Sequence, residues 1–452
     1  MHRNLSKIAL VGLALAIAST AGVPLFAQPN TGSANFGTYV SLGDSLTAGF
    51  ISGGLIETVQ VNSYPALIYQ QATAKTTGFE QPLVTPPGIP AILQLRSLLP
   101  LSITPAAGQG KPANIGLARP YNNLGIPGSR VHDLVATTTG GLHDLILRNP
   151  AFHNTTALVQ ALSQHPTFVT LWIGNNDVLA AATSGVVIDN VTLTTVASFQ
   201  ADFTAAVQAI TASGAKLAIA NIPDVTSIPF VTTLPPVLLN PATNKPVIFN
   251  GKPVPLIGPH GLLGPGDHVL LTAAAELAKG IGIPAPLGTG QPLTDDVVLD
   301  AQETATIEAR LAAFNGIIAS VGNQVGAALV DTNSLLKQLA TSGIDVGGVT
   351  FTGAFLTGGV FSYDGVHPTP FGYAFVANAF IDAINAKFGA QIPEADLSPF
   401  MFGPPASGGV LAASTGAGIF TDQAVRNLGW IFNWPQSSTT PAPPPRRKHR
   451  GH

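Results

Sequence analysis

The chain has 452 residues and few charged side chains: 46% are hydrophobic and 10% are Asp, Glu, Lys or Arg, compared with about 25% charged in an ordinary soluble domain. Its length allows one large domain or two smaller ones with a sizeable core. A formal net charge of −3 provides no basic surface for nucleic acid. The lack of cysteine excludes disulfides and a thiol nucleophile.

The N-terminus has the pattern of a secretory signal. Arg3 and Lys7 precede an apolar run over 8–18, and small residues follow it. The run is shorter than the roughly 20 residues that a membrane-spanning helix needs, so we favour a cleaved signal over a retained anchor. We assign residues 1–27 to the signal peptide, with cleavage after Ala21 as the alternative. The protein is therefore expected to be exported to the periplasm, the cell surface or the medium of a bacterium.

Short β-branched and aromatic runs alternate with amphipathic stretches along residues 33–395. This alternation is typical of a parallel sheet covered by helices. The strand-like runs lie at 38–42, 167–173, 215–222 and 326–331. Apolar residues at three- and four-residue spacing predict helices over 197–210, over 300–321 and from about residue 370. Asp300 and Glu303 form a capping-box pattern at the start of the second helix.

Two proline-rich segments interrupt this alternation, at 79–120 and 229–292. Proline at this density is expected to prevent regular β-ladders and helices. Segments of this length inside a domain usually form lids or binding walls, or are disordered. We favour walls around a substrate pocket, with disorder as the alternative.

The C-terminal part of the chain has a weaker pattern. An extension over 396–434 contains one helix-like stretch, at 422–432. The tail, 435–452, is rich in proline and carries four basic residues: Arg446, Arg447, Lys448 and Arg450. We expect this tail to be disordered, with weak contact to an anionic envelope surface as the alternative.

The first strand-like run ends in Gly43, Asp44 and Ser45, within VSLGDSLTAGF. A strand that ends sharply and continues as a helix places one hydroxyl at the carboxyl edge of the sheet, where open α/β sheets bind ligands. Ser45 is therefore a candidate nucleophile. In the alternative interpretation, Asp44 or Ser45 only caps the next helix and Gly43 forms the turn.

A serine nucleophile needs a base that takes its proton and a third group that orients this base. The stretch FSYDGVHP contains Asp364 and His367, three positions apart on a glycine-containing loop before a helix. A single tight turn can bring the two side chains together. Taken alone the pair is a weak indication, because most histidines are structural or exposed to solvent.

Two further stretches offer hydrogen-bond donors for a carbonyl oxygen that becomes negative. Gly128 in NLGIPGS lacks a side chain, so its N–H can approach a ligand closely; Gly125 is the alternative. Asn176 in GNND follows a strand-like run, and its side-chain amide can donate. Each residue alone would also fit an ordinary turn at the end of a strand.

Together, the four stretches resemble the sequence blocks of the GDSL or SGNH hydrolase family. GDSLTAGF, NLGIPGS, GNND and DGVHP occur in the family's order over most of the chain. The resemblance implies an α/β fold, a three-layer α/β/α sandwich with a flavodoxin-like parallel sheet, over residues 33–395. The two proline-rich segments would be insertions in this domain.

The resemblance also implies a role for each matching residue. Ser45 would be the nucleophile, His367 the general base and Asp364 the group that orients the imidazole. The Ser45 N–H, the Gly128 N–H and the Asn176 amide would form the oxyanion hole.

We therefore expect a serine ester hydrolase that uses no cofactor and no metal. Six other histidines lack metal-ligand spacing and are expected to be structural or solvent-exposed: His132, His143, His153, His165, His260 and His268. Apolar walls would suit a lipid-like ester substrate. The alternatives are a carbohydrate acetyl esterase and a non-catalytic surface-binding protein on the same scaffold.

Overall fold

The computed structural model describes residues 29–98, 101–241, 243–401 and 419–435. The signal peptide assigned to 1–27 lies outside the described residues, as does the tail from residue 436 onward. In the described part of the chain, no helix combines the length and the apolar character needed to cross a membrane.

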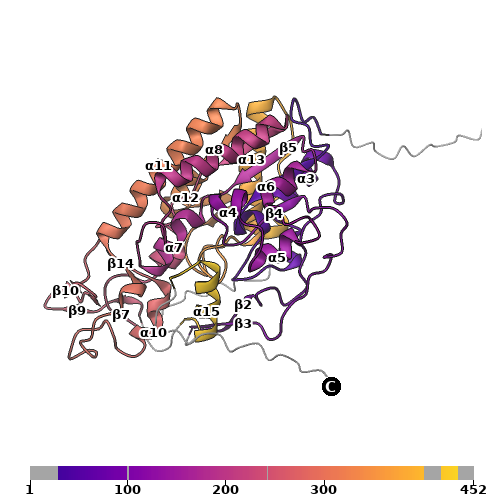
Figure 1. The fold of residues 1–452 in the computed structure, drawn as a ribbon. Coiled ribbons are helices and arrows are strands. Elements are labelled where there is room, and N and C mark those ends of the chain that lie inside the picture. Colours follow the sequence, from indigo (N-terminus) through magenta and orange to yellow (C-terminus); the bar gives the residue numbers. More distant parts are fainter. Residues whose placement is uncertain (1–28, 99–100, 242, 402–418, 436–452) are drawn as a thin grey trace, which may run out of the picture.

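Five parallel strands form the central sheet (Figure 1). They are β1 (Tyr39–Gly43), β4 (Asn123–Gly125), β5 (Phe168–Trp172), β6 (Lys216–Ala220) and β15 (Ala328–Val330). Their spatial order is β15-β6-β5-β1-β4. Counted from the first strand of the chain, this is the 2-1-3-4-5 order of flavodoxin-like folds.

Helices cover both faces of this sheet, because successive side chains of each strand point to opposite faces. One face packs against α3 (Tyr64–Thr73) and α13 (Pro370–Phe388). The other face is covered by α4 (Val131–Ala136), α6 (Ala157–Leu162), α8 (Val196–Ala212) and α11 (Ala301–Gln324). The predicted three-layer α/β/α fold is confirmed.

The predicted elements of this domain correspond to elements of the structure. The four strand-like runs coincide with β1, β5, β6 and β15 to within one or two residues at their ends, and the three predicted helices are α8, α11 and α13. The capping box of Asp300 and Glu303 forms at the start of α11. The sequence patterns did not identify β4 as a strand, because three residues are too few to show an alternation.

The prediction that the proline-rich segments lack regular ladders was wrong. In 79–120, β2 (Leu93–Leu98) pairs with β3 (Leu101–Pro105) in an antiparallel hairpin. In 229–292, prolines stand at the ends of short paired strands, where a missing N–H disturbs little of the ladder. This segment projects away from the sheet, at the lower left of Figure 1. It contains α9 (Pro229–Thr232), β7 (Leu239–Asn240), β8 (Lys245–Pro246), β9 (Ile248–Phe249), β10 (Lys252–Pro253), β11 (Ile257–Gly258), β12 (Gly261–Leu262), β13 (His268–Val269), a 3₁₀ turn (Leu271–Ala273) and α10 (Ala274–Leu277).

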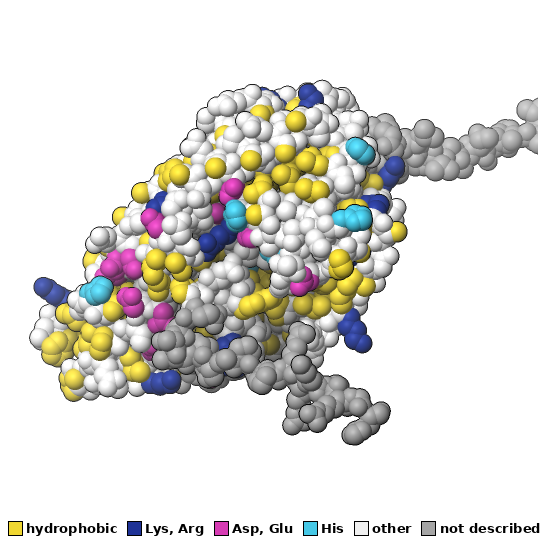
Figure 2. Space-filling view, in the orientation of Figure 1, with side chains coloured by type: hydrophobic (Ala, Val, Ile, Leu, Met, Phe, Trp, Pro, Cys, Tyr) yellow, Lys and Arg dark blue, Asp and Glu magenta, His cyan; other side chains and the backbone are white. Residues whose placement is uncertain are grey.

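The remaining elements connect or flank the layers. They are α1 (Ser45–Ala48), α2 (Glu57–Gln60), α5 (Leu142–Leu147), α7 (Asn176–Ser184), a 3₁₀ turn (Asp295–Val297), β14 (Val298–Leu299), α12 (Thr332–Thr341), β16 (Ile344–Val346), β17 (Val349–Phe351), α14 (Ser398–Met401) and α15 (Asp422–Ile431). Helix α15 confirms the predicted helix at 422–432 and packs against β3. Much of the face shown in Figure 2 is uncharged, as the composition predicts.

Candidate active site

The candidate nucleophile lies at the carboxyl end of β1. This strand pairs with β4 on one side and with β5 on the other. Gly43 ends this strand in a space too small for a side chain, since a Cβ would lie 2.3 Å from the carbonyl oxygen of Trp172. The Asp44 carboxylate then caps α1 by accepting from the Leu46 N–H at 3.0 Å. Ser45 is the first residue of α1. Asp44 is therefore the helix cap, and this capping holds Ser45 at the edge of the sheet.

Ser45, His367 and Asp364 form one hydrogen-bonded chain. Ser45 Oγ lies 2.9 Å from His367 Nε2, and His367 Nδ1 lies 2.8 Å from Asp364 Oδ2. A carboxylate only accepts hydrogen bonds, so Nδ1 carries the ring proton and Nε2 is left to accept from the Ser45 hydroxyl. The three residues are 5%, 1% and 0% exposed. The structure thus brings together three side chains that the sequence separates by 322 positions.

A tight turn brings Asp364 and His367 together, as the sequence predicts. Gly365 has φ +72°, which favours glycine, and the Ser362 N–H donates to the His367 carbonyl oxygen at 2.8 Å. Asp364 Oδ1 accepts from the backbone N–H groups of Val366 and His367 at 3.0 and 2.9 Å. The turn therefore holds the carboxylate and the imidazole in one fixed arrangement.

Two buried carboxyl groups beside His367 have opposite pKa shifts. Burial would raise the pKa of Asp364, but the His367 imidazole and the hydrogen bonds to the carboxylate outweigh it, and the pKa lies below its ordinary value. Burial raises the pKa of Asp44 to about 6, against weaker lowering by hydrogen bonds from Asn175 and Leu46. Asp364 is thus the carboxylate suited to stabilise a protonated imidazole.

The GNND stretch ties three loops together through three consecutive side chains. Asn175 Nδ2 donates to Asp44 Oδ2 at 2.7 Å, which anchors the turn of the nucleophile. Asn176 Nδ2 donates to the Ser129 carbonyl oxygen at 2.9 Å. Asp177 Oδ2 accepts from the Val131 N–H at 3.0 Å, and burial raises the pKa of Asp177 to about 7. Asn176 has a second amide hydrogen, which this contact leaves available.

The two candidate glycines of NLGIPGS have different environments. The Gly125 N–H donates to Asn123 Oδ1 at 2.9 Å, and a Cβ on Gly125 would lie 2.5 Å from the Ala48 nitrogen. Gly128 has φ +84°. Within the described residues, neither the Gly128 N–H nor the Ser45 N–H donates a hydrogen bond. These two N–H groups are therefore available to a ligand, whereas the Gly125 N–H is not.

The described residues contain no group of three or more potential metal ligands. Two of the scattered histidines have specific partners: His132 Nδ1 lies 3.0 Å from Asp202 Oδ2, and His143 Nε2 lies 3.1 Å from Ser129 Oγ.

Several residues of the site were not identified from the sequence. Asn175 directly precedes Asn176, which was identified, but the contact of Asn175 with Asp44 spans 131 positions. The Phe50 ring lies 4.8 Å from the imidazole of His367, and the Phe432 ring lies 6.0 Å from it, between centroids. No local pattern distinguishes these phenylalanines from ordinary core residues.

The sequence profile of GDSL-like lipases and acylhydrolases matches residues 39–380 of this chain. The chain belongs to this family. It is therefore a GDSL-like hydrolase that acts on ester bonds, and all of the residues discussed above except Phe432 lie within the matched region.

Solved structures of esterases and lipases are similar to this GDSL-like hydrolase. One is a catalytic mutant of an acetylxylan esterase from Geobacillus stearothermophilus, with 12% identity, a TM-score of 0.34, and coverage of 76% of this chain and 93% of that chain. Another is an extracellular lipase from Streptomyces rimosus, with 14% identity, a TM-score of 0.33, and coverage of 77% and 98%. No curated protein sequence matches the chain.

Proposed function

We propose that the protein is an exported serine hydrolase that cleaves carboxylic esters through an acyl-enzyme on Ser45. The hydrogen-bonded chain from Ser45 Oγ through His367 to Asp364 carries this proposal, because it contains the nucleophile, the base and the orienting group within bonding distance. A non-catalytic binding protein would have no need for this chain.

The geometry supports the following reaction. Ser45 Oγ attacks the ester carbonyl carbon while its proton moves to His367 Nε2. The protonated imidazole is stabilised by the Asp364 carboxylate at Nδ1, and it then protonates the leaving alcohol. Water then gives a proton to His367 Nε2 and attacks the carbonyl carbon of the acyl-enzyme. The imidazolium returns this proton to Ser45 Oγ as the bond between Oγ and the acyl carbon breaks, and the carboxylic acid leaves.

The negative oxygen of each tetrahedral intermediate needs donors. We assign the Ser45 N–H, the Gly128 N–H and the free amide hydrogen of Asn176 to this oxyanion hole. The two N–H groups donate to none of the described residues, and Asn176 Nδ2 contacts the residue that follows Gly128. Each such donor contributes roughly 3 to 4 kcal/mol to the stability of the transition state.

Hydrolysis of p-nitrophenyl esters tests the proposal. We expect the Ser45→Ala variant to lower kcat by roughly 10⁴- to 10⁶-fold. Asp382→Asn, at an exposed carboxylate on α13, is the control variant; it should be folded and keep the kcat of the unaltered protein. A Ser45→Ala variant with the kcat of the unaltered protein would reject the mechanism.

A comparison of acyl-chain lengths, together with acetylated polysaccharide, would define the substrate class. We favour a lipid-like acyl group, because the site is bordered by aromatic rings. A strong preference for the polysaccharide would favour the alternative, a carbohydrate acetyl esterase. N-terminal sequencing of the protein recovered outside the cytoplasm tests export, with a mature N-terminus near residue 28 as the expected result.

A further inference from the structure

The residues that follow α15 lie against the catalytic histidine. Phe432, Asn433 and Trp434, which we call the C-terminal lid, stand outside the region matched by the family profile. The Phe432 ring is 1% exposed, and it is nearly parallel to the imidazole of His367, with 20° between the planes and 6.0 Å between the centroids. The lid therefore contacts the general base directly.

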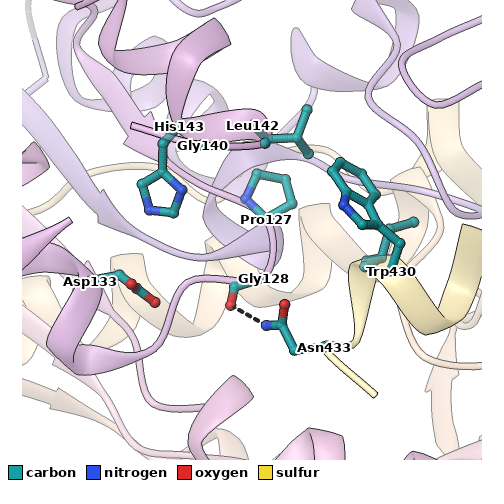
Figure 3. A pocket seen from close by; sticks show the side chains of 10 residues that line it. Pro127, Gly128, Asp133, Gly140, Leu142, His143, Trp430 and Asn433 are labelled. Atoms are coloured by element: carbon teal, nitrogen blue, oxygen red, sulfur yellow. Dashed lines mark hydrogen bonds between the residues drawn. The ribbon is translucent and has the colours of Figure 1, made fainter. Parts of the chain in front are cut away.

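The same lid also contacts the loop that carries the proposed oxyanion donor. Asn433 Nδ2 donates to the Gly128 carbonyl oxygen at 2.9 Å (Figure 3). A substrate carbonyl must reach Ser45 Oγ between the base on one side and the Gly128 N–H on the other. Consecutive lid residues therefore border this space, Phe432 beside His367 and Asn433 beside Gly128.

The burial of the nucleophile agrees with a closed site. Ser45 is only 5% exposed. A cavity of about 260 Å³ lies beside the lid, and Gly128, His143 and Trp430 help to line it (Figure 3). Neither Ser45 nor His367 is part of its lining. The cavity therefore adjoins the proposed oxyanion hole at Gly128, and the lid residue Asn433 also lines it.

We propose that the C-terminal lid closes the active site, and that Phe432 fills the binding site for an apolar acyl group until the substrate displaces it. This inference rests on the proposed esterase function. The surroundings of the Phe432 ring indicate the chemistry of the group that replaces it. The Phe230 ring lies 6.0 Å away edge-on, and the imidazole lies 6.0 Å away and nearly parallel. A space vacated by a phenyl ring among these groups accepts a medium-length acyl chain better than a polar one.

Residues 419–431, which precede the lid, are anchored to the rest of the domain, so the proposed movement is that of the lid. The Ile103 N–H donates to the Ile419 carbonyl oxygen at 2.8 Å, and Leu428 and Ile431 of α15 are buried. The lid itself is fastened by two side-chain hydrogen bonds. One is the Asn433 contact, and the other joins Trp434 Nε1 to Thr183 Oγ1 at 2.8 Å.

The Trp434–Thr183 bond can be removed from either side without touching the catalytic residues. Trp434→Phe removes the donor. Thr183→Val removes the acceptor and also the bond that Thr183 Oγ1 donates to the Leu179 carbonyl oxygen at 2.8 Å within α7. A neutral hydrogen bond contributes a net stabilisation that corresponds to a roughly two- to ten-fold change in an equilibrium. If the lid must open before substrate binds, the apparent affinity changes by the same factor.

We therefore expect Trp434→Phe and Thr183→Val each to raise kcat/KM for p-nitrophenyl octanoate by roughly two- to ten-fold. The double variant should gain no more than Thr183→Val alone, because the Trp434–Thr183 bond is already lost in that single variant. Phe432→Ala should raise kcat/KM more for the octanoate than for the acetate. The matched control is Arg426→Lys, at an exposed side chain on α15 that does not line the cavity, which should change kcat/KM by less than about two-fold.

Amide hydrogen exchange provides a second readout that needs no hydrolysis. The peptide containing residues 432–434 should exchange faster in Trp434→Phe and Thr183→Val than in Arg426→Lys. Unchanged or lower kcat/KM in both Trp434→Phe and Thr183→Val, or unchanged hydrogen exchange of this peptide, would overturn the proposed lid. A protein that hydrolyses neither ester but shows the faster exchange would support the lid movement and contradict the proposed function.

Discussion

Replacement of Asp364 by asparagine should abolish most of the activity, because this carboxylate accepts hydrogen bonds on both oxygens. Oδ2 accepts from His367 Nδ1 and from the Gly53 N–H, both at 2.8 Å. Oδ1 accepts from the N–H groups of Val366 and His367 and, at 3.2 Å, from Ser362 Oγ. A side-chain amide has only one oxygen, so it cannot serve both sets of donors.

Either orientation of the asparagine places its NH₂ against at least two other donors. With NH₂ at the Oδ2 position, the imidazole can avoid this conflict only by moving its proton from Nδ1 to Nε2. Protonated Nε2 can no longer accept the proton of Ser45. With NH₂ at the Oδ1 position, the backbone N–H groups of Val366 and His367 lose their acceptor. We expect kcat to fall by about 10⁴-fold and the free energy of unfolding by roughly 2 to 4 kcal/mol.

The assay is steady-state hydrolysis of p-nitrophenyl acetate, with the folded fraction of each variant measured by urea unfolding in the same buffer. Asp382→Asn makes the same chemical change at an exposed carboxylate and should leave both quantities almost unchanged. An Asp364→Asn protein that is folded and retains kcat within about ten-fold of the unaltered enzyme would refute the role assigned to this carboxylate.

Three further predictions concern the oxyanion hole, the buried carboxyl groups and the nucleophile turn. Asn176→Ala should lower kcat by about 10²- to 10³-fold with little change in KM, and an equal loss of kcat in the control Asn427→Ala on α15 would count against a specific role. The pKa values of Asp44 and Asp177 in the folded protein, about 6 and about 7, lie above the ordinary value of 3.8, so the folded protein holds protons that the unfolded chain has released. The free energy of unfolding, measured with urea, should therefore fall as pH rises from 4 to 7, by roughly 3 kcal/mol for Asp44 alone. An Asp44→Asn variant with the same pH dependence of this free energy would contradict the prediction. Gly43→Ala places a methyl group 2.3 Å from the Trp172 carbonyl oxygen and should lower the thermal midpoint by several degrees; an unchanged midpoint would show that the turn can relax.

Much of the fold could be predicted from the sequence because the pattern of each element is local. The runs that correspond to β1, β5, β6 and β15 are long enough to show their burial, and Asp300 with Glu303 marks the start of α11 by a contact three residues apart. Strand β4 is too short for such a pattern. The β2–β3 hairpin forms in a segment where proline density predicted none, because Pro105 stands at the end of its strand.

The catalytic residues could be proposed because each lies in a distinctive short motif, and the parallel sheet brings those motifs to one edge. The choice between Gly125 and Gly128 depended on which N–H is already bonded, which only the structure shows. The position of Phe432 against His367 was not predictable. A buried phenylalanine after an amphipathic helix fits any apolar core, and the contact joins residues that lie far apart in the sequence.

The most direct test of the account is covalent labelling of the nucleophile with a fluorophosphonate, read by mass spectrometry of the intact protein and of its peptides. We expect one label per chain, located on Ser45, and no label in Ser45→Ala. Labelling at another residue, or equal labelling of Ser45→Ala, would contradict the claim that Ser45 is the group activated by His367 and Asp364.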